Sequence, residues 1–245
     1  KEREIFKLPY FPDRIIHHCI MQVLEPIWKK TLIRDTYSSI KGRGLHDGVR
    51  RVKQALKDVA GTQYCLKLDI KKFYPSVDHD VLKQIIRKKI KCIDTLWLLD
   101  EIIDSTSGVP IGNYLSQYFG NIYLSSLDHF VKEHYKAKHY FRYCDDIVIL
   151  AQNKQRLRRT LMGIIWYCKE IKLTLKGNYQ IFPVDNRGID FLGYRFFHDY
   201  VLLRKSIVKR FKEKIHGVKD SWTRTDKRTV VNGIMSYWGW IKHGD

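Results

Sequence analysis

Acidic residues follow apolar, β-prone runs at two distant places in the chain, and this pattern constrains the fold more than any other feature. Residues 64–70 alternate like a strand and carry Asp69 near their end. Residues 140–143 and 147–150 are also β-prone, and Asp145 and Asp146 lie between them, at or near the tip of an expected hairpin. If these strands lie side by side, three carboxylates converge, and such a cluster is costly unless a cation neutralises it.

The rest of the chain alternates between helical and β-prone segments. Apolar residues recur at helical spacing in several stretches, Asp78 is a suitable N-cap for one of them, and the chain is again helical and strongly basic from Arg204. This order predicts an α+β domain with an antiparallel sheet. Helices are expected at 14–33, 46–59, 78–90, 115–131 and 154–171, and further strands at 171–175, 179–182, 191–197 and 200–203.

The chain is strongly basic, with 45 Lys and Arg against 26 Asp and Glu and a formal net charge of +19 over 245 residues. Nucleic acid is the commonest partner for such a chain, since each neutralised phosphate releases condensed counterions. An anionic membrane is the rival partner, but we find no lipid-anchor motif and no apolar stretch long enough to span a bilayer. The five cysteines form no C-x-x-C pair, which is typical of a reduced, cytosolic protein.

The three acids have the chemistry of a metal site for phosphoryl transfer. Carboxylate oxygens are hard ligands that suit Mg²⁺. Two such ions about 4 Å apart stabilise both the attacking and the leaving oxygens of an in-line displacement, so the protein supplies mainly positioning and charge. A solvated turn is the alternative interpretation of Asp145 and Asp146, because Asp is a common turn residue. The apolar runs before both acidic sites favour the functional interpretation.

Four short motifs resemble those of reverse transcriptases, and they occur in the expected order. Residues 69–74 (Asp-Ile-Lys-Lys-Phe-Tyr) resemble motif A, residues 109–117 motif B, residues 143–146 (Tyr-Cys-Asp-Asp) the YxDD box of motif C, and residues 191–196 the primer grip. One such match would be weak, but four in sequence are specific. The resemblance implies an RNA-directed DNA polymerase with two Mg²⁺ ions, or Mn²⁺ as a substitute. The expected metal ligands are Asp69, Ile70, Asp145 and Asp146.

The resemblance also implies a right-hand polymerase architecture. Residues 1–62 and 91–108 would form the fingers, and residues 63–90 and 109–203 would form a palm with an antiparallel sheet of the ferredoxin-like type. Residues 204–245 would begin a helical thumb, which we expect to be partial. The expected primer grip consists of Phe191, Leu192, Gly193 and Tyr194.

A nucleotide-binding set follows from the same resemblance. Tyr74 would be the steric gate, where a bulky ring crowds the ribose 2′-OH, with a core aromatic as the alternative. Relatives usually carry an Arg in the fingers loop where this chain has Ile40, so Lys41 or Arg43 would contact the triphosphate. Lys172 or Lys176 would act as the general acid for pyrophosphate. The remaining members of the set are Lys71, Lys72, Phe73, Ile111, Gly112 and Gln117.

Motif B indicates a subtype. Residues 110–112 read Pro-Ile-Gly where most prokaryotic relatives have Pro-Gln-Gly, and this resembles reverse transcriptases of diversity-generating retroelements. That resemblance implies a cytoplasmic enzyme, encoded by a bacterium or phage, that copies a template RNA with errors mainly at adenines. A DNA or RNA primer, dNTPs and a small basic pentameric accessory protein would be its partners. Ile111 can only pack where Gln would hydrogen-bond, which would weaken discrimination between base pairs.

Other functions remain open from the sequence alone. A group II intron, retron or antiphage reverse transcriptase would catalyse the same reaction in a different biological role. A non-catalytic RNA-binding protein with a polymerase fold is an alternative from a different functional class, a binding protein instead of an enzyme. The intact Asp69, Asp145 and Asp146 argue against it. Stabilisation by Mg²⁺ would distinguish the last alternative, since a ligand that binds only the folded state raises the melting temperature.

Overall fold

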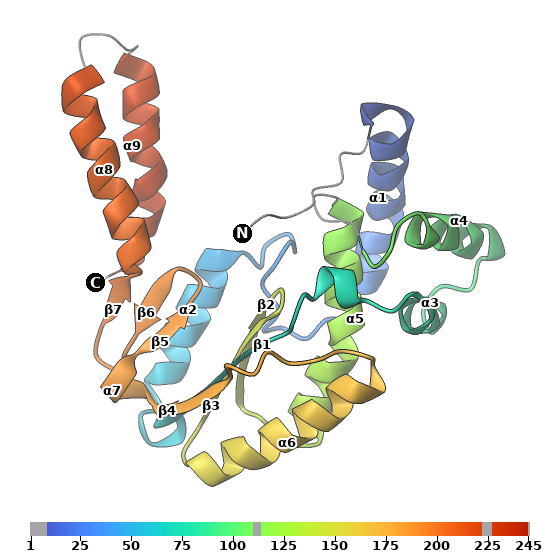
Figure 1. Ribbon diagram of the computed structural model, residues 1–245, viewed down its shortest axis with the longest axis horizontal. Coiled ribbons are helices and arrows are strands. Elements are labelled where there is room, and N and C mark those ends of the chain that lie inside the picture. The colour runs from blue at the N-terminus through green and yellow to red at the C-terminus, as the bar shows by residue number, and fades with distance from the viewer. Residues whose placement is uncertain (1–8, 110–113, 222–226, 245) are drawn as a thin grey trace.

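An antiparallel sheet of four strands, in the order β2-β3-β1-β4, forms the centre of the molecule (Figure 1). The computed structural model describes residues 9–109, 114–221 and 227–244. A second antiparallel sheet has the order β5-β6-β7. The strands are β1 (Tyr64–Asp69), β2 (His139–Tyr143), β3 (Asp146–Ala151), β4 (Gln180–Pro183), β5 (Ile189–Phe191), β6 (Tyr194–Phe196) and β7 (Val201–Leu203).

Helices surround both sheets. In the described residues they are α1 (Ile15–Lys29), α2 (Leu45–Leu56), α3 (His79–Arg87), α4 (Ile93–Asp104), α5 (Tyr114–Glu133), α6 (Lys154–Glu170), α7 (Val184–Arg187), α8 (Lys205–Ser221) and α9 (Lys227–Ile241). Short helical turns lie at Tyr10–Arg14, Ala60–Thr62 and Tyr74–Ser76. Figure 1 shows α8 and α9 rising from one side of the molecule, and α1 and α4 lying on the opposite side.

The main hydrophobic core lies between one face of the four-stranded sheet and helices α5 and α6. Successive strand residues point to opposite faces, so Leu66 and Leu68 of β1 share this face with Ile147 and Ile149 of β3. All four side chains are buried. α5 buries apolar side chains along most of its length, from Leu115 to Val131.

A second buried cluster covers one end of the opposite face of the sheet. There Cys65, Val148 and Leu150 pack against α2 and the three-stranded sheet. Lys67 and Asp69 follow Cys65 on the same face of β1, because side chains two residues apart in a strand share a face. Asp69 pairs with Asp146 across the sheet, at the end away from the Cys65–Leu150 pair. The acidic pair therefore lies at the other end of this face from that cluster.

The expected α+β class with antiparallel sheets is confirmed, and most predicted elements are present. Asp78 caps α3 as expected, because its side chain accepts a hydrogen bond from the backbone N–H of Val81. The hairpin around Asp145 is also confirmed. The helix α4 was not predicted, since only a fingers segment was assigned to residues 91–108.

Two strand predictions are wrong, the first entirely and the second in part. The predicted strand at 171–175 does not form; only Leu175 makes an isolated bridge, with Ile70, and Lys172 has a positive φ of 54°. The predicted strand at 191–197 is broken, because Leu192 and Gly193 both have positive φ and turn the chain between β5 and β6. Backbone of that kind ends a strand and starts a hairpin.

None of the helices in residues 9–109, 114–221 and 227–244 combines the length and apolarity that a bilayer crossing requires.

Candidate active site

Strand pairing brings together the acidic residues predicted from the sequence. Asp69 ends β1 and is the Cα partner of Asp146, the first residue of β3. Tyr143 also pairs with Asp146, so Cys144 and Asp145 form a two-residue turn between β2 and β3. Cys144 adopts a φ of 53° at this turn. The turn places Asp145 directly beside the Asp69–Asp146 pair.

The local environment makes the carboxyl groups of Asp145 and Asp146 easier to protonate. The pKa of Asp145 is raised to about 6, chiefly by burial and also by a hydrogen bond and charge repulsion from the neighbouring Asp69. Burial also raises the pKa of Asp146 to about 6, against the opposing attraction of Lys67. Both shifts are the expected result of placing like charges together in a poorly solvated site. The arrangement is unfavourable for three carboxylates without cations nearby.

Two lysines supply part of the missing positive charge. Lys176 forms an ion pair with Oδ2 of Asp69, and the Lys67 ammonium lies 3.5 Å from Oδ2 of Asp146. The second oxygens, Oδ1 of Asp69 and Oδ1 of Asp146, are buried and have no hydrogen-bond partner among the residues that the structure describes. Buried polar atoms without partners cost free energy. A divalent cation is a natural partner for such orphaned carboxylate oxygens, so the residues present fit a hard metal ion.

The coordination geometry itself is not formed in the structure. Among the described residues, no three His, Cys, Asp or Glu side chains stand where they could jointly hold a metal ion. The metal ligands predicted from the sequence, including Ile70, therefore remain a prediction. Ile70 is fully buried next to Asp69 and bridges to Leu175.

A buried arginine supports the turn that carries Asp145. Arg142 is completely buried, and its guanidinium forms three contacts of 2.7 to 3.0 Å with the carboxylate of Asp128 in α5. The same guanidinium donates to the backbone oxygen of Cys144 at 3.1 Å and to the side-chain oxygen of Asn121 at 3.1 Å. Asn121 in turn donates to the backbone oxygen of Ser38 at 2.7 Å. The network joins the turn, α5 and the loop before α2.

Tyr74, the predicted steric gate, lies beside this turn. Its ring packs against Phe73 and close to Gly120 of α5, where an added Cβ would be 3.2 Å from the Tyr74 ring. Burial raises the pKa of Tyr74, and the adjacent Cys144 and Asp145 raise it further. The Cys144 thiol also lies 2.8 Å from the Ser38 hydroxyl. The phenol therefore lies next to the acids, and its role as a steric gate stays a prediction.

The other predicted nucleotide contacts are only partly assembled. Lys41, Lys71 and Lys72 are exposed, whereas the guanidinium of Arg43 donates to the backbone oxygen of Ile33 at 2.9 Å and is already engaged. Phe73 is buried. Gln117 of α5 accepts a hydrogen bond of 2.6 Å from Ser39. Ile111 and Gly112 lie outside the described residues.

The predicted primer-grip residues form the turn of the β5–β6 hairpin. Phe191 and Tyr194 are fully buried on either side of Leu192 and Gly193. Gly193 has a φ of 85°, and a Cβ added there would collide with the Trp240 ring. The hydroxyl of Tyr194 donates to the backbone oxygen of Trp240 at 2.9 Å, so the end of α9 is fastened to this hairpin.

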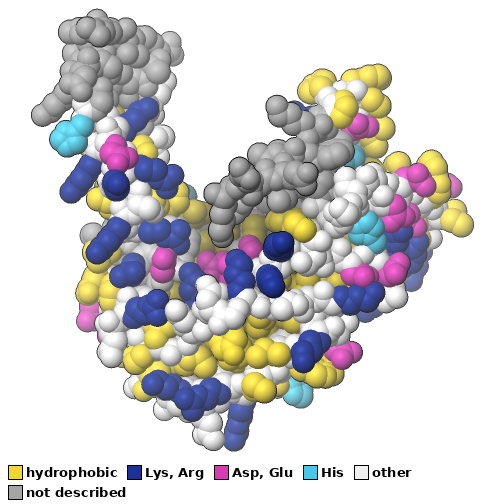
Figure 2. Space-filling model, viewed as in Figure 1, with side chains coloured by type: hydrophobic (Ala, Val, Ile, Leu, Met, Phe, Trp, Pro, Cys, Tyr) yellow, Lys and Arg dark blue, Asp and Glu magenta, His cyan; other side chains and the backbone are white. Residues whose placement is uncertain are grey.

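A polar cleft connects the acids with this hairpin. It has a volume of about 340 Å³, and its lining includes Lys67, Asp69, Asn178, Gln180, Arg187, Asp190 and Arg195. Figure 2 shows acidic side chains on the floor of the hollow below the α8–α9 pair, with Lys and Arg side chains around them. Of the two candidate general acids, Lys176 lies at the acids, whereas Lys172 is 2.7 Å from Asp78.

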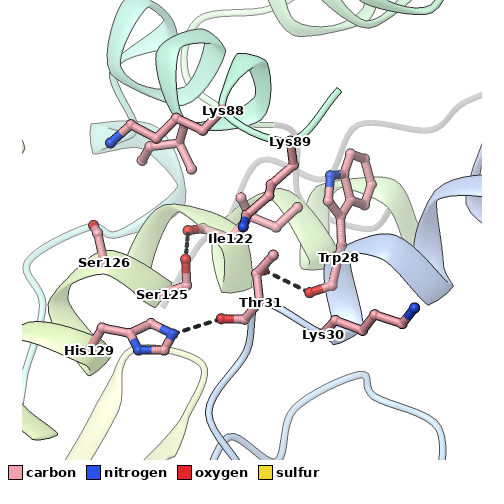
Figure 3. A pocket seen from close by; sticks show the side chains of 10 residues that line it. Trp28, Lys30, Thr31, Lys88, Lys89, Ile122, Ser125, Ser126 and His129 are labelled. Atoms are coloured by element: carbon pink, nitrogen blue, oxygen red, sulfur yellow. Dashed lines mark hydrogen bonds between the residues drawn. The ribbon is translucent and has the colours of Figure 1, made fainter. Parts of the chain in front are cut away.

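A separate cavity of about 300 Å³ lies between the ends of α1 and α3 and the side of α5 (Figure 3). Its lining includes Lys30, Lys88 and Lys89, which follow the C-terminal ends of α1 and α3. Positive charges at these positions interact favourably with the negative C-terminal ends of the helix dipoles, so a structural role explains the three lysines. The part of the lining that comes from α5 includes Ser125, Ser126 and His129.

Comparison with known proteins decides the family. The family model described as reverse transcriptase (RNA-dependent DNA polymerase) matches residues 2–196, which covers most of the chain and all three acids. The chain belongs to the reverse transcriptase family.

Curated relatives of this reverse transcriptase are distant. Protein YkfC of Escherichia coli is 24% identical over 236 residues, a match that covers 77% of this chain and 61% of YkfC. The group II intron-encoded protein LtrA of Lactococcus lactis is 27% identical over 135 residues and is matched over 51% of this chain and 22% of LtrA. Nuclear intron maturase 1 of Arabidopsis thaliana is 26% identical over 92 residues, 38% of this chain and 12% of the maturase. The chain spans less than two thirds of each of these relatives.

Solved structures with the same fold include two structures of the telomerase of Candida tropicalis. The apo telomerase aligns with a TM-score of 0.57 at 14% identity, over 74% of this chain and 39% of that chain. The telomerase in complex with a fragment of telomeric RNA aligns with a TM-score of 0.59 at 15% identity, over 76% and 37%. These similarities show the reverse transcriptase fold.

The sequence analysis did not identify two residues of the site, Lys67 and Arg142. Lys67 stands two positions before Asp69, and the strand period of two would have placed both on one face. Arg142 directly precedes Tyr143, but nothing local indicates that its charge is buried against Asp128.

Proposed function

We propose that this chain is an RNA-directed DNA polymerase whose reaction depends on Asp69, Asp145 and Asp146. The single observation that carries the proposal is the register of β1 and β3, which pairs Asp69 with Asp146 beside the Asp145 turn. Two of these carboxylates each keep one buried oxygen without a partner. In this proposal Asp69, Asp145 and Asp146 hold two Mg²⁺ ions, with Mn²⁺ as an alternative, which would neutralise charge on the phosphates.

The chain's own residues would bind and orient the substrates. Tyr74 would crowd the 2′ position of the incoming sugar, and the exposed Lys71 and Lys72 after β1 would meet the triphosphate. Lys176, held at Asp69, would lie close enough to deliver a proton to departing pyrophosphate. The Leu192–Gly193 turn would support the primer end. Exposed lysines and arginines on α8 would follow the phosphates of the duplex: Lys205, Lys209, Arg210, Lys212 and Lys214.

The proposed division into subdomains follows from the same roles. Fingers would comprise residues 1–62 and 91–108, and the palm residues 63–90 and 109–203, which contain both sheets. The thumb would begin with α8 and α9. Template RNA, primer and dNTPs would meet in the hollow below α8 and α9 (Figure 2).

The biological setting has two candidates. Residues 110–112 and Gln117 support an error-prone enzyme of a diversity-generating retroelement, which would work with a small basic pentameric protein. The curated relatives LtrA and nuclear intron maturase 1 favour a group II intron setting instead. Fidelity separates the two, since only the first requires frequent errors opposite adenine. Ile111→Gln should lower that error rate if Ile111 causes it, and an unchanged error spectrum would remove the assigned role.

Primer extension on a defined RNA template tests the activity. The purified chain is supplied with Mg²⁺ and all four dNTPs, and the products are sequenced. We expect extension by the wild type, and a loss of about 10²-fold or more in Asp145→Asn, because a metal-binding carboxylate contributes several kcal/mol to the transition state. Equal extension by both proteins would refute the assigned role of Asp145. Accurate extension would support the polymerase activity and contradict the assignment to a diversity-generating retroelement.

A further inference from the structure

Lys67 lies between the acidic site and the β5–β6 hairpin. Its ammonium is 3.5 Å from Oδ2 of Asp146 and also donates to the backbone oxygen of Asp190 in β5. These two contacts come from different sheets, since Asp146 begins β3 of the four-stranded sheet and Asp190 belongs to the three-stranded sheet. A single side chain therefore links the predicted catalytic hairpin with the predicted primer grip.

The link continues from Asp190 to the helical pair. The carboxylate of Asp190 binds the guanidinium of Arg204, with contacts of 2.6 and 2.8 Å. Arg204 directly precedes α8, and its backbone N–H donates to the backbone oxygen of Gly193 at 2.9 Å. The path thus runs from Asp146 through Lys67 and Asp190 to the base of α8.

The location of Lys67 favours a role in substrate positioning over one in stability. Its side chain is 27% exposed, and it lines the 340 Å³ cleft together with Asp69, Arg187 and Arg195. The Lys67–Asp146 pair is partly exposed, at 27% and 30% of the two side chains, so solvent screening reduces its contribution to folding stability. A cleft with three cationic side chains beside a carboxylate pair is suited to the phosphates of a nucleic-acid strand end.

We propose that Lys67 is a positioning residue with two separable effects, an inference that rests on the proposed polymerase function. Through Asp190 it sets the position of the primer-grip hairpin relative to the acids, and so determines affinity for the primer end. Through Asp146 its positive charge weakens the binding of divalent cations at the acids. Removing the charge should therefore tighten metal binding while weakening primer binding.

Three variants separate these effects. Lys67→Met removes both contacts and keeps the length of the side chain. Arg204→Met breaks only the distal ion pair with Asp190. Lys138→Met is the matched control, because Lys138 forms an exposed ion pair of 2.7 Å with Asp58 next to His139, at the end of the β2–β3 hairpin away from Asp146.

Two measurements that need no turnover are made on the full chain. Mn²⁺ affinity is measured by electron paramagnetic resonance, and affinity for a labelled RNA–DNA primer–template duplex by fluorescence anisotropy. For Lys67→Met we expect Mn²⁺ binding about threefold tighter and duplex binding about fivefold weaker, as befits a half-exposed charged contact. Arg204→Met should weaken duplex binding similarly and leave Mn²⁺ binding unchanged. Lys138→Met should change neither.

Steady-state kinetics provide the second readout. In Lys67→Met the KM for primer–template should rise about fivefold, while the KM for dNTP stays within about twofold of the wild type. Binding and kinetics of Lys67→Met that match those of Lys138→Met would overturn the proposal. Weaker Mn²⁺ binding in Lys67→Met would also overturn it. Failure of the wild type to extend any primer would refute the polymerase function, and the two binding measurements would still judge the role of Lys67.

Discussion

The β2–β3 hairpin and the β5–β6 hairpin both reverse direction over two residues. Cys144 and Asp145 form the first turn, and Leu192 and Gly193 form the second. Each turn contains a non-glycine residue with φ near 53°, so the two turns require a similar left-handed backbone conformation. The environments are opposite, because polar and charged groups surround the first turn and aromatic rings surround the second.

The comparison shows how one backbone device serves two purposes. The Cys144 turn is held by the buried guanidinium of Arg142, which donates to the backbone oxygen of Cys144. The Gly193 turn is held by packing, with Trp240 against its glycine and Phe191 buried beneath. Directional hydrogen bonds fix the position of charges, whereas packing gives a firm surface without specific polar groups.

Breaking the ion pair behind the first turn should have the largest effect. Asp128→Ala would leave Arg142 as an unpaired charge in a site with no solvent exposure. We expect a loss of about 3–5 kcal/mol in the free energy of unfolding. Urea denaturation measures it, with Asp58→Ala as a control for an exposed ion pair. A loss no larger than that of Asp58→Ala would show that the network does not hold the turn.

Substituting the glycine of the second turn should have an intermediate effect. Gly193→Ala places a Cβ at a φ of 85° and against the Trp240 ring. We expect a loss of about 1–3 kcal/mol in the free energy of unfolding, from strain and overpacking together. Urea denaturation is again the measurement. Combining the change with Trp240→Ala should recover part of the loss, and no recovery would contradict the role assigned to that contact.

The smallest expected effect is the pH dependence that Asp145 of the first turn gives to the free energy of unfolding. The pKa of Asp145 is raised to about 6 in the folded protein, so the folded state holds this proton more tightly than the unfolded state does. Stability without metal should therefore fall as pH rises from about 4 through about 6. Asp145→Asn should be more stable than the wild type by roughly 1 kcal/mol at pH 7, after allowance for solvent screening.

Melting temperatures of both proteins in chelator between pH 4 and 8 check this expectation. The difference between them should vanish near pH 4, where both side chains are neutral. A saturating amount of Mg²⁺ should reverse the order at pH 7, because the ion would stabilise only the intact set of acids. A difference that does not depend on pH would mean that Asp145 is not strained by burial and by Asp69.

Much of the fold could be predicted from local pattern. The alternation in β1, β2 and β3, the helical spacing of α5 and α6 and the cap at Asp78 are short-range properties, and each formed as expected. Residues 171–175 and 191–197 failed because apolar composition alone does not reveal where φ becomes positive. The helix α4 was missed because its apolar residues do not form a clear stripe, and its buried side chains are Leu99 and Ile103 only.

The sequence by itself determined that Asp69 lies near the end of a strand and that Asp145 and Asp146 lie at or near the tip of a hairpin. Those features depend on neighbouring residues, whose backbone preferences act over a few positions. Only the tertiary structure decided that Lys67 meets both Asp146 and Asp190, and that Arg142 is buried on Asp128. The choice of partner for a charge depends on which distant segments exclude water around it. That choice becomes defined only when the sheets and helices are packed.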